Sequence, residues 1–200
     1  MQTYHLNQSS NTSIVIVGGG AGGLELAIKL GRRYKKQSRK VILVDKNRTH
    51  IWKPLLHEVA AGSLDPDIDG VDYLSVGNKN CFIFHLGSMV ELNRQTQKIM
   101  LAPLLDDDGN VVLNSRELEY AKLVFALGSV TNDFGTVGAK ENCIFLDFPA
   151  SAQKFHIKLL NEFLRLQSDD KNHNLEIAIV GAGATGVELA AELYKTSELL

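Results

Sequence analysis

Three glycines near the start of the chain have the spacing that lets a backbone loop hold a phosphate group. Gly18, Gly20 and Gly23 form a Gly-x-Gly-x-x-Gly pattern, with Ala21 and Gly22 between the last two. The first glycine permits a tight turn, the second lets the backbone approach a pyrophosphate, and the third lets a helix and a strand pack closely. Because free N–H groups and a positive dipole end begin the predicted helix, we expect it to favour an anion there.

The elements around these glycines occur in the order that dinucleotide binding needs. Ile14–Val17 is a short apolar, β-branched run, typical of a buried parallel strand, and apolar residues at helical spacing follow the glycines. The next apolar run begins at Val41 and ends in Asp45. A carboxylate there can accept hydrogen bonds from both hydroxyls of an adenosine ribose, although a surface aspartate at a strand end is the simpler alternative. The order of strand, glycines, helix, strand and acid favours the nucleotide.

A second glycine pattern occurs near the other end of the chain. Gly181, Gly183 and Gly186 have the same spacing, with Ala184 and Thr185 between the last two. The apolar run 175–180 before them predicts a strand, and the residues after them predict a helix. Two such patterns indicate two dinucleotides, one per domain. That arrangement suits a flavoprotein that takes electrons from a nicotinamide.

Composition narrows the class of protein. The 200 residues are 44% hydrophobic and 22% charged, which is typical of a globular protein, and the net charge of −2 gives no electrostatic argument for nucleic acid. Cys81 and Cys143 are far apart, so they suggest structural thiols in a reduced, cytosolic compartment, with Cys143 in a buried strand. The polar residues 1–12 predict a mobile tail without a signal peptide. No apolar run approaches the roughly 20 residues of a membrane span.

The rest of the chain predicts an open parallel sheet with helices on both faces and a small antiparallel meander inserted between strands. We expect one domain over 13–168, a polar linker, and the first unit of a second domain over 175–200. The other expected elements are helices over 54–62, 72–77 and 151–167, strands over 81–86, 88–92, 97–101, 116–120 and 122–128, a turn at 106–110 and a loop over 134–140.

Several stretches together resemble the type II NADH dehydrogenases, single-subunit flavoproteins that pass electrons from NADH to membrane quinone. The most specific is the run Lys-Pro-Leu-Leu-His-Glu-Val-Ala-Ala-Gly that begins at Lys53. The resemblance covers nearly all of the chain after the tail, and its other stretches are 13–23, 41–45, 123–138 and 177–193. It implies an α/β fold with a Rossmann-like FAD-binding domain and the start of a Rossmann-like NAD-binding domain.

The resemblance also implies roles for individual residues. Those implied to bind FAD are Gly18, Gly20, Ala21, Gly22, Gly23, Asp45, Lys46, Lys53, Val90, Ala126 and Gly128. Those implied to bind NADH are Gly181, Gly183, Ala184, Thr185, Gly186 and Glu188. Glu188 matches an acid near the contact of nicotinamide and flavin, while Lys53 and Pro54 match the turn beside the flavin ring. These three are therefore the expected catalytic residues.

Simpler explanations exist for some of these side chains. Glu188 could be an acid in the first turn of a helix, where the helix dipole favours it. His57 is a packed or surface histidine rather than a base, and Lys53 could be an ordinary loop lysine. Glu25 and Glu192 are most simply solvated helix charges.

Three other functions stay open. A disulfide reductase needs two close cysteines against the flavin, and residues 53–62 contain none. A ferredoxin-type reductase shares the glycine patterns, as does a dinucleotide-binding fragment without catalysis.

The second glycine pattern is followed by too few residues for a complete βαβ unit, which needs about 30. We therefore expect the N-terminal part of a longer enzyme, with residues 1–200 inactive alone. The resemblance implies that the longer enzyme reduces quinone and lies peripherally on the cytoplasmic, inner face of the cell membrane. A homodimer is a further expectation.

Overall fold

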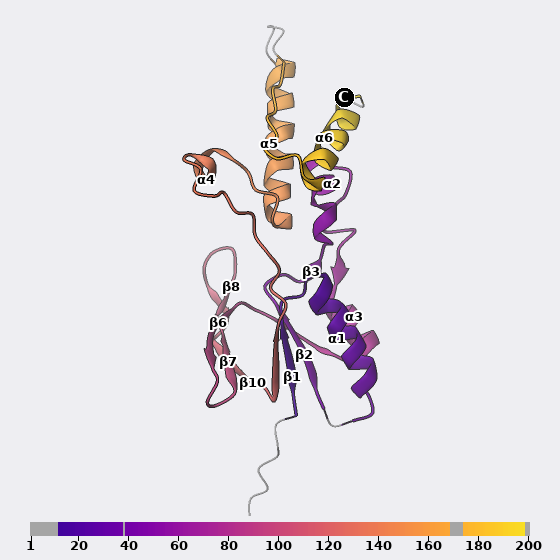
Figure 1. Ribbon diagram of the computed structural model, residues 1–200, viewed down its shortest axis with the longest axis vertical. Helices are drawn as coiled ribbons and strands as arrows, with labels where there is room; N and C mark the ends of the chain where they lie inside the picture. The colour runs from indigo at the N-terminus through magenta and orange to yellow at the C-terminus, as the bar shows by residue number, and fades with distance from the viewer. Residues whose placement is uncertain (1–11, 38, 169–173, 199–200) are drawn as a thin grey trace, which may run out of the picture. The chain divides into compact units, whose positions relative to one another are not determined.

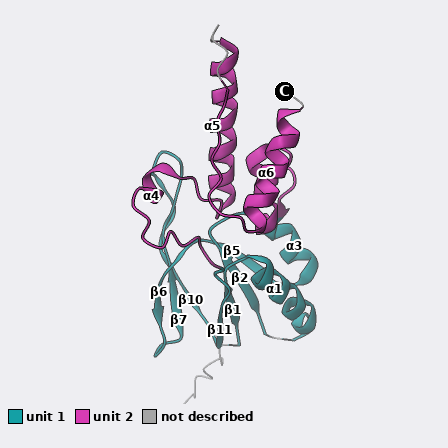
Figure 2. Ribbon diagram, turned by 45° about the horizontal axis from the view of Figure 1, so that its top comes forward, with its two compact units in different colours: residues 1–50, 72–128 teal, residues 51–71, 129–200 magenta. Residues whose placement is uncertain are grey.

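The computed structural model describes residues 12–37, 39–168 and 174–198, which form two compact units. Figure 2 shows unit 1, residues 1–50 with 72–128, in teal and unit 2, residues 51–71 with 129–200, in magenta. Residues 1–11 of the predicted tail and 169–173 of the predicted linker lie outside the described residues. The domain division into 13–168 and 175–200 stays a prediction.

A parallel sheet forms the centre of unit 1 (Figure 1). Its strands are β1 (Ile14–Val17), β2 (Val41–Asp45), β5 (Ile83–Leu86) and β11 (Lys122–Phe125), in the order β11-β1-β2-β5. β1 lies in the interior of this sheet, with Ile14 opposite Val41 on one side and Lys122 on the other. Strands 3, 2, 1 and 4 of a doubly wound fold have this order, so the expected Rossmann-like class is confirmed.

Alternate residues of the sheet serve two different cores. Ile14, Ile16, Val41 and Leu43 pack on one face against α1 (Ala21–Tyr34), α3 (Tyr73–Asn80) and Phe82. Val15, Val17, Ile42 and Val44 pack on the other face. Because side chains of a strand point alternately to opposite faces, a strand that is apolar throughout is buried on both.

Within the described residues of unit 1, the meander covers the second face, so the expectation of helices on both faces is wrong for this unit. β6 (Met89–Asn93), β7 (Lys98–Leu101) and β10 (Arg116–Glu119) pair antiparallel in the order β10-β7-β6. Ile99 and Leu101 are fully buried and supply the apolar surface that meets the parallel sheet. β8 (Leu104–Leu105) and β9 (Val111–Leu113) form a hairpin across the predicted turn.

Unit 2 is built from helices. Its elements are the 3₁₀ turn η1 (Lys53–Leu55), α2 (Leu56–Ala61), α4 (Ala139–Asn142), α5 (Pro149–Ser168) and α6 (Ala184–Ser197). Leu56, Val59 and Ala60 of α2 pack with Ala152 of α5 and Leu189 of α6. This core accounts for the membership of α5 in unit 2. The short strands β3 (Thr49–His50) and β4 (Val71–Asp72) lie where the chain passes between the units.

The structure corrects two sequence expectations in unit 2. Residues 175–180 do not form a strand, and Val180 is 90% exposed. A strand needs the hydrogen bonds of a neighbouring strand, and in the described part of the chain none pairs with this run. Cys143 is exposed and ends α4 instead of lying in a buried strand. Among the described helices, none is both long and apolar enough to cross a membrane.

Candidate functional site

The first glycine pattern of unit 1 forms the turn between β1 and α1. Gly18 has a φ of +105°, which side chains other than hydrogen rarely tolerate, and its N–H donates to the carbonyl of Val44 at 2.8 Å. A Cβ on Gly23 would overlap the carbonyl oxygen of Gly18. Both positions therefore require glycine for the turn itself, whatever the turn binds.

The N-terminus of α1 is open where a phosphate would bind. Gly20 is the N-cap residue, and no side chain caps the helix. The first N–H groups of a helix lack partners within the helix, and they carry the positive end of its dipole. No atom outside the neighbouring backbone lies within 4 Å of a Cβ built on Gly20 or Gly22. This uncapped end with open space beside it fits the pyrophosphate of a dinucleotide.

Gly19 is held by two side chains of unit 1. Its N–H donates to Asp45 Oδ2 at 2.6 Å, and its carbonyl accepts from the hydroxyl of Tyr73 at 2.7 Å. Asp45 Oδ1 also accepts from the N–H of Asn47 at 2.8 Å. A carboxylate has about four acceptor sites, so Asp45 keeps capacity for a ribose hydroxyl while it fixes the turn.

Tyr73 is a site residue that sequence reasoning missed. It is 2% exposed, its ring stacks on Phe84 at 4.9 Å between centroids, and a Cβ on Gly19 would overlap it. Burial raises the pKa of Tyr73, and the charge of Asp45 adds to that shift, so the hydroxyl stays protonated as a donor. Only one feature of the sequence could have indicated its position. Asp72 caps α3 by accepting from the N–H of Ser75, so the helix begins at Tyr73.

The remaining predicted FAD residues of unit 1 are Ala126, Gly128, Val90 and Lys46. Ala126 lies against Gly18, and its N–H donates to the carbonyl of Val17 at 2.8 Å. Gly128 has a φ of +75°, which favours glycine. Val90 lies on β6 and is 62% exposed, while Lys46 follows Asp45 directly. Their contacts with a cofactor stay predictions.

The second glycine pattern repeats the geometry of the first within unit 2. Gly181 has a φ of +112°, and a Cβ on Gly186 would overlap the Gly181 carbonyl oxygen. Gly183 is the N-cap of α6, without a capping side chain and without an atom within 4 Å of a built Cβ. Ala184 and Thr185 begin the helix. The turn thus has this geometry although residues 175–180 before it do not form the expected strand. The shape of the turn again fits a pyrophosphate.

Glu188 does not have the position that the helix-dipole explanation requires. It is the fifth residue of α6, and the first turn of that helix contains no acid. Its side chain is 46% exposed, and Oε2 lies 3.4 Å from Nδ1 of His57 on α2. His57 is only 9% exposed, so the alternative of a packed histidine is confirmed. The contact with Glu188 gives it a neighbour that the sequence did not reveal.

Lys53 is tied to another segment of unit 2. Its Nζ donates to the carbonyl of Ser129 at 2.8 Å and to Asp147 Oδ1 at 3.2 Å. Asp147 also accepts from the N–H and the hydroxyl of Thr131. Burial alone would raise the pKa of Asp147, but the bonds from Thr131 and Lys53 outweigh it and hold that pKa below its usual value. Pro54 lies in the first turn of η1, and the catalytic roles of Lys53 and Pro54 stay predictions.

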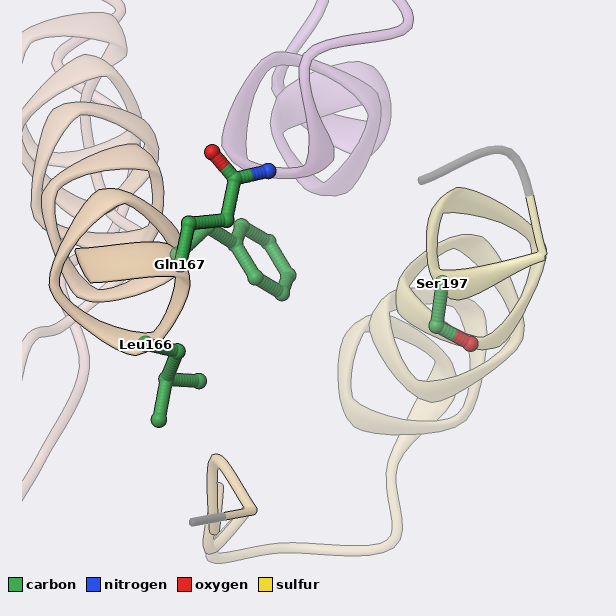
Figure 3. Close-up of a pocket in the computed structure, with 4 residues that line it drawn as sticks. Leu166, Gln167 and Ser197 are labelled. Atoms are coloured by element: carbon green, nitrogen blue, oxygen red, sulfur yellow. The ribbon is translucent and has the colours of Figure 1, made fainter. Parts of the chain in front are cut away.

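The remaining acids and a pocket of unit 2 do not form a site. Glu192 accepts a hydrogen bond from the Ser63 hydroxyl at 3.0 Å, so it is a contact residue and not simply a solvated charge; Glu25 pairs with Lys29 on the surface of unit 1. Leu166 and Gln167 of α5 and Ser197 of α6 line a pocket with Phe163 (Figure 3). That pocket has no titratable side chain. No group of metal-ligating side chains is present in the described ranges.

Comparison with known proteins agrees with these observations. A family model described as pyridine nucleotide-disulphide oxidoreductase matches residues 12–198. The chain is 44% identical to a type II NADH:quinone oxidoreductase of Haemophilus influenzae over 93% of this chain and 46% of that protein. For a protein of the same name from Staphylococcus aureus, the identity is 28% over 90% of this chain and 42% of the relative. The chain thus spans less than half the length of these relatives.

Among solved structures, NDH2 of Plasmodium falciparum in complex with NADH aligns with a TM-score of 0.74 at 24% identity. The alignment covers 94% of this chain and 38% of that structure. At this identity the likeness establishes the fold.

Proposed function

This chain belongs to the pyridine nucleotide-disulphide oxidoreductase family, and from that premise we propose that the protein is an FAD-dependent NADH:quinone oxidoreductase of type II. The observation that carries the proposal is the repetition of one turn geometry in two separate compact units. Each turn has a glycine of positive φ, a third glycine packed against it and an uncapped helix N-terminus. Two sites that suit pyrophosphates match a reaction between two dinucleotides.

We assign FAD to the turn of unit 1, because the acid that ribose binding requires is present there. Asp45 ends β2 and already holds the turn through Gly19. When bound, FAD would supply the redox chemistry, since a flavin exchanges electrons with both nicotinamides and quinones. The protein's own part is to bind the pyrophosphate at Gly18–Gly23 and to orient the cofactor; Lys46, Val90, Ala126 and Gly128 complete that set, and Lys53 and Pro54 keep the role beside the flavin ring that the resemblance implies.

NADH is the proposed substrate of the turn in unit 2. Gly181, Gly183 and Gly186 would hold its pyrophosphate, and Ala184 and Thr185 would supply helix N–H groups. Glu188 lies on the same helix, in the position of the acid that the resemblance places near the nicotinamide. Quinone as the acceptor is supported by the Haemophilus influenzae relative at 44% identity.

The complete protein is also proposed to lie peripherally on the inner face of the cell membrane and to form a homodimer. Both proposals follow from the resemblance alone, and co-sedimentation with vesicles and analytical ultracentrifugation test them. A disulfide-type reaction is the rival function. It is disfavoured because residues 53–62, the stretch that would carry the cysteine pair, contain none.

The test uses the complete protein, purified and kept free of oxygen. We expect the absorbance of a bound flavin, bleaching of that absorbance by one equivalent of NADH, and its return on addition of a soluble quinone. A protein that purifies without flavin and does not take it up would contradict the cofactor assignment. Bleaching by NADH without reoxidation by quinone would instead indicate another acceptor, such as a ferredoxin.

A further inference from the structure

The contact between His57 and Glu188 is a feature of unit 2 that the proposed function does not yet use. The Nδ1 of His57 is buried and makes no hydrogen bond within the described residues, yet Glu188 Oε2 lies only 3.4 Å away. The other ring nitrogen, Nε2, lies 3.9 Å from Glu58 Oε1. A buried polar atom without a partner costs free energy. A small movement of Glu188 that completes this hydrogen bond is therefore favoured.

The two partners differ in how freely they can move. His57 lies on α2 beside Leu56, Val59 and Ala60, which are at most 2% exposed, so the backbone that carries its ring is fixed by the core. The side chain of Glu188 is nearly half exposed and has more rotatable bonds. In such a pair the position of the histidine ring is fixed, and the carboxylate of Glu188 rotates to meet it.

We propose that His57 is a positioning residue for Glu188: the fixed imidazole holds the carboxylate beside the turn Gly181–Gly186. This inference rests on the proposed function, in which that turn binds NADH. Glu188 follows Gly186 by two residues on α6, so a constraint on its carboxylate acts where the nicotinamide dinucleotide would enter. In this role His57 acts only through the acid.

The protonation of the imidazole ring decides which of its nitrogens can donate to Glu188. A neutral imidazole carries one N–H, and a bond from Nδ1–H to Glu188 leaves Nε2 as an acceptor. A protonated imidazole donates from both nitrogens and faces two carboxylates, Glu188 and Glu58. These two are the charged groups that the described structure places against His57. The orientation of the Glu188 carboxylate is thus coupled to one buried ring.

The first arm of the test detects the contact without cofactor or turnover. The complete protein is labelled with ¹⁵N-histidine, and the ring nitrogens are observed by NMR. The signals of His57 and His156 are identified as those that disappear in His57→Asn and His156→Leu. We expect Glu188→Gln to change the Nδ1 signal of His57, and the control Glu192→Gln, on the same helix but bonded to Ser63, to leave it unchanged. An unchanged signal in Glu188→Gln overturns the proposal. This arm decides even if the protein binds no flavin, so its failure is distinct from a failure of the proposed function.

The second arm measures flavin reduction by NADH under anaerobic conditions. His57→Leu should lower the limiting rate at saturating NADH about tenfold while the Kd for NADH changes less than about threefold. His57→Asn, whose amide can donate from near the Nδ1 position, should restore most of that rate. The matched control is His156→Leu, which removes another histidine of unit 2 that lies against Gly62. A limiting rate unaffected by His57→Leu, an equal loss in His156→Leu, or no rescue by His57→Asn would each overturn the positioning role.

Discussion

Replacing Gly20 by valine should separate cofactor binding from folding in unit 1. Gly20 has φ −59° and ψ −178°, which a β-branched residue adopts without strain, and its built Cβ meets nothing within 4 Å. The expected cost to the free energy of unfolding is that of a poorer N-cap, about 0.5–1 kcal/mol. The same open space is where the proposed FAD pyrophosphate approaches the backbone, so the isopropyl group and the phosphate compete for it.

The effect on the cofactor should be much larger than the effect on the fold. Steric overlap in a tightly packed contact costs about 1–3 kcal/mol, which corresponds to an FAD affinity lowered about 5–150-fold. Gly20→Val should therefore purify with a lower flavin-to-protein ratio than the wild type, and with a urea midpoint near that of the flavin-free wild type. The two readouts are the flavin-to-protein absorbance ratio and isothermal titration with FAD.

Gly183→Val is the matched variant, because Gly183 has the same N-cap place in the other turn and an equally open Cβ position. It should keep its flavin and lose affinity for NADH by a similar factor. Full flavin content in Gly20→Val, or loss of flavin in Gly183→Val, would refute the assignment of FAD to unit 1 and NADH to unit 2. Loss of folding in both variants would refute the premise that these positions are sterically free.

Three further changes test other contacts. Changing both Cys81 and Cys143 to serine should leave the rate of flavin reduction by NADH within about twofold of the wild type, since both thiols are exposed and unpaired; a large loss in stopped-flow traces would mean a thiol relay. Tyr73→Phe should lower the free energy of unfolding by about 1–2 kcal/mol in urea titrations, because the buried Gly19 carbonyl loses its donor; an unchanged midpoint would show that the bond does not contribute. The Asp147 carboxylate, with its lowered pKa, should stabilise unit 2 above the pKa of an unfolded aspartate, about 4, and lose that contribution as pH falls through the folded pKa. Asp147→Asn should therefore show a smaller drop in thermal midpoint between pH 6 and 3, and an equal drop would contradict the argument.

The sequence predicted the parts of the fold that depend on local patterns. Both glycine turns were found because positive φ, close packing and phosphate approach each require glycine at a fixed spacing. The helix over 151–167 was found because its apolar residues recur at helical spacing, and the structure places it at Pro149–Ser168. The meander was found because short strands alternate with turn residues.

What could not be predicted depends on which distant segments meet. The run 175–180 has strand composition, but a strand exists only where a partner lies beside it, and that partner is a property of the tertiary structure. Tyr73 lies outside every motif, and the motif that contains His57 does not indicate which residue its ring contacts. Their partners, Gly19 and Glu188, are far away in the sequence. The sequence predicted the meander but not that it packs on the second face of the sheet, because hydrophobic periodicity does not say which elements pack together.

The place of β1 inside the sheet has a consequence for how the protein is made. β1 is synthesised early, but one of its two neighbours, β11, begins at Lys122, about a hundred residues later. At about 5–20 residues per second, the nascent chain must wait on the order of ten seconds before that side of β1 can be covered. During this interval a fully apolar strand has an unpaired edge, which is the form that recruits chaperones or aggregates. Slower synthesis between β2 and β11 should therefore lower the soluble yield in cells, even though the finished protein has the same stability.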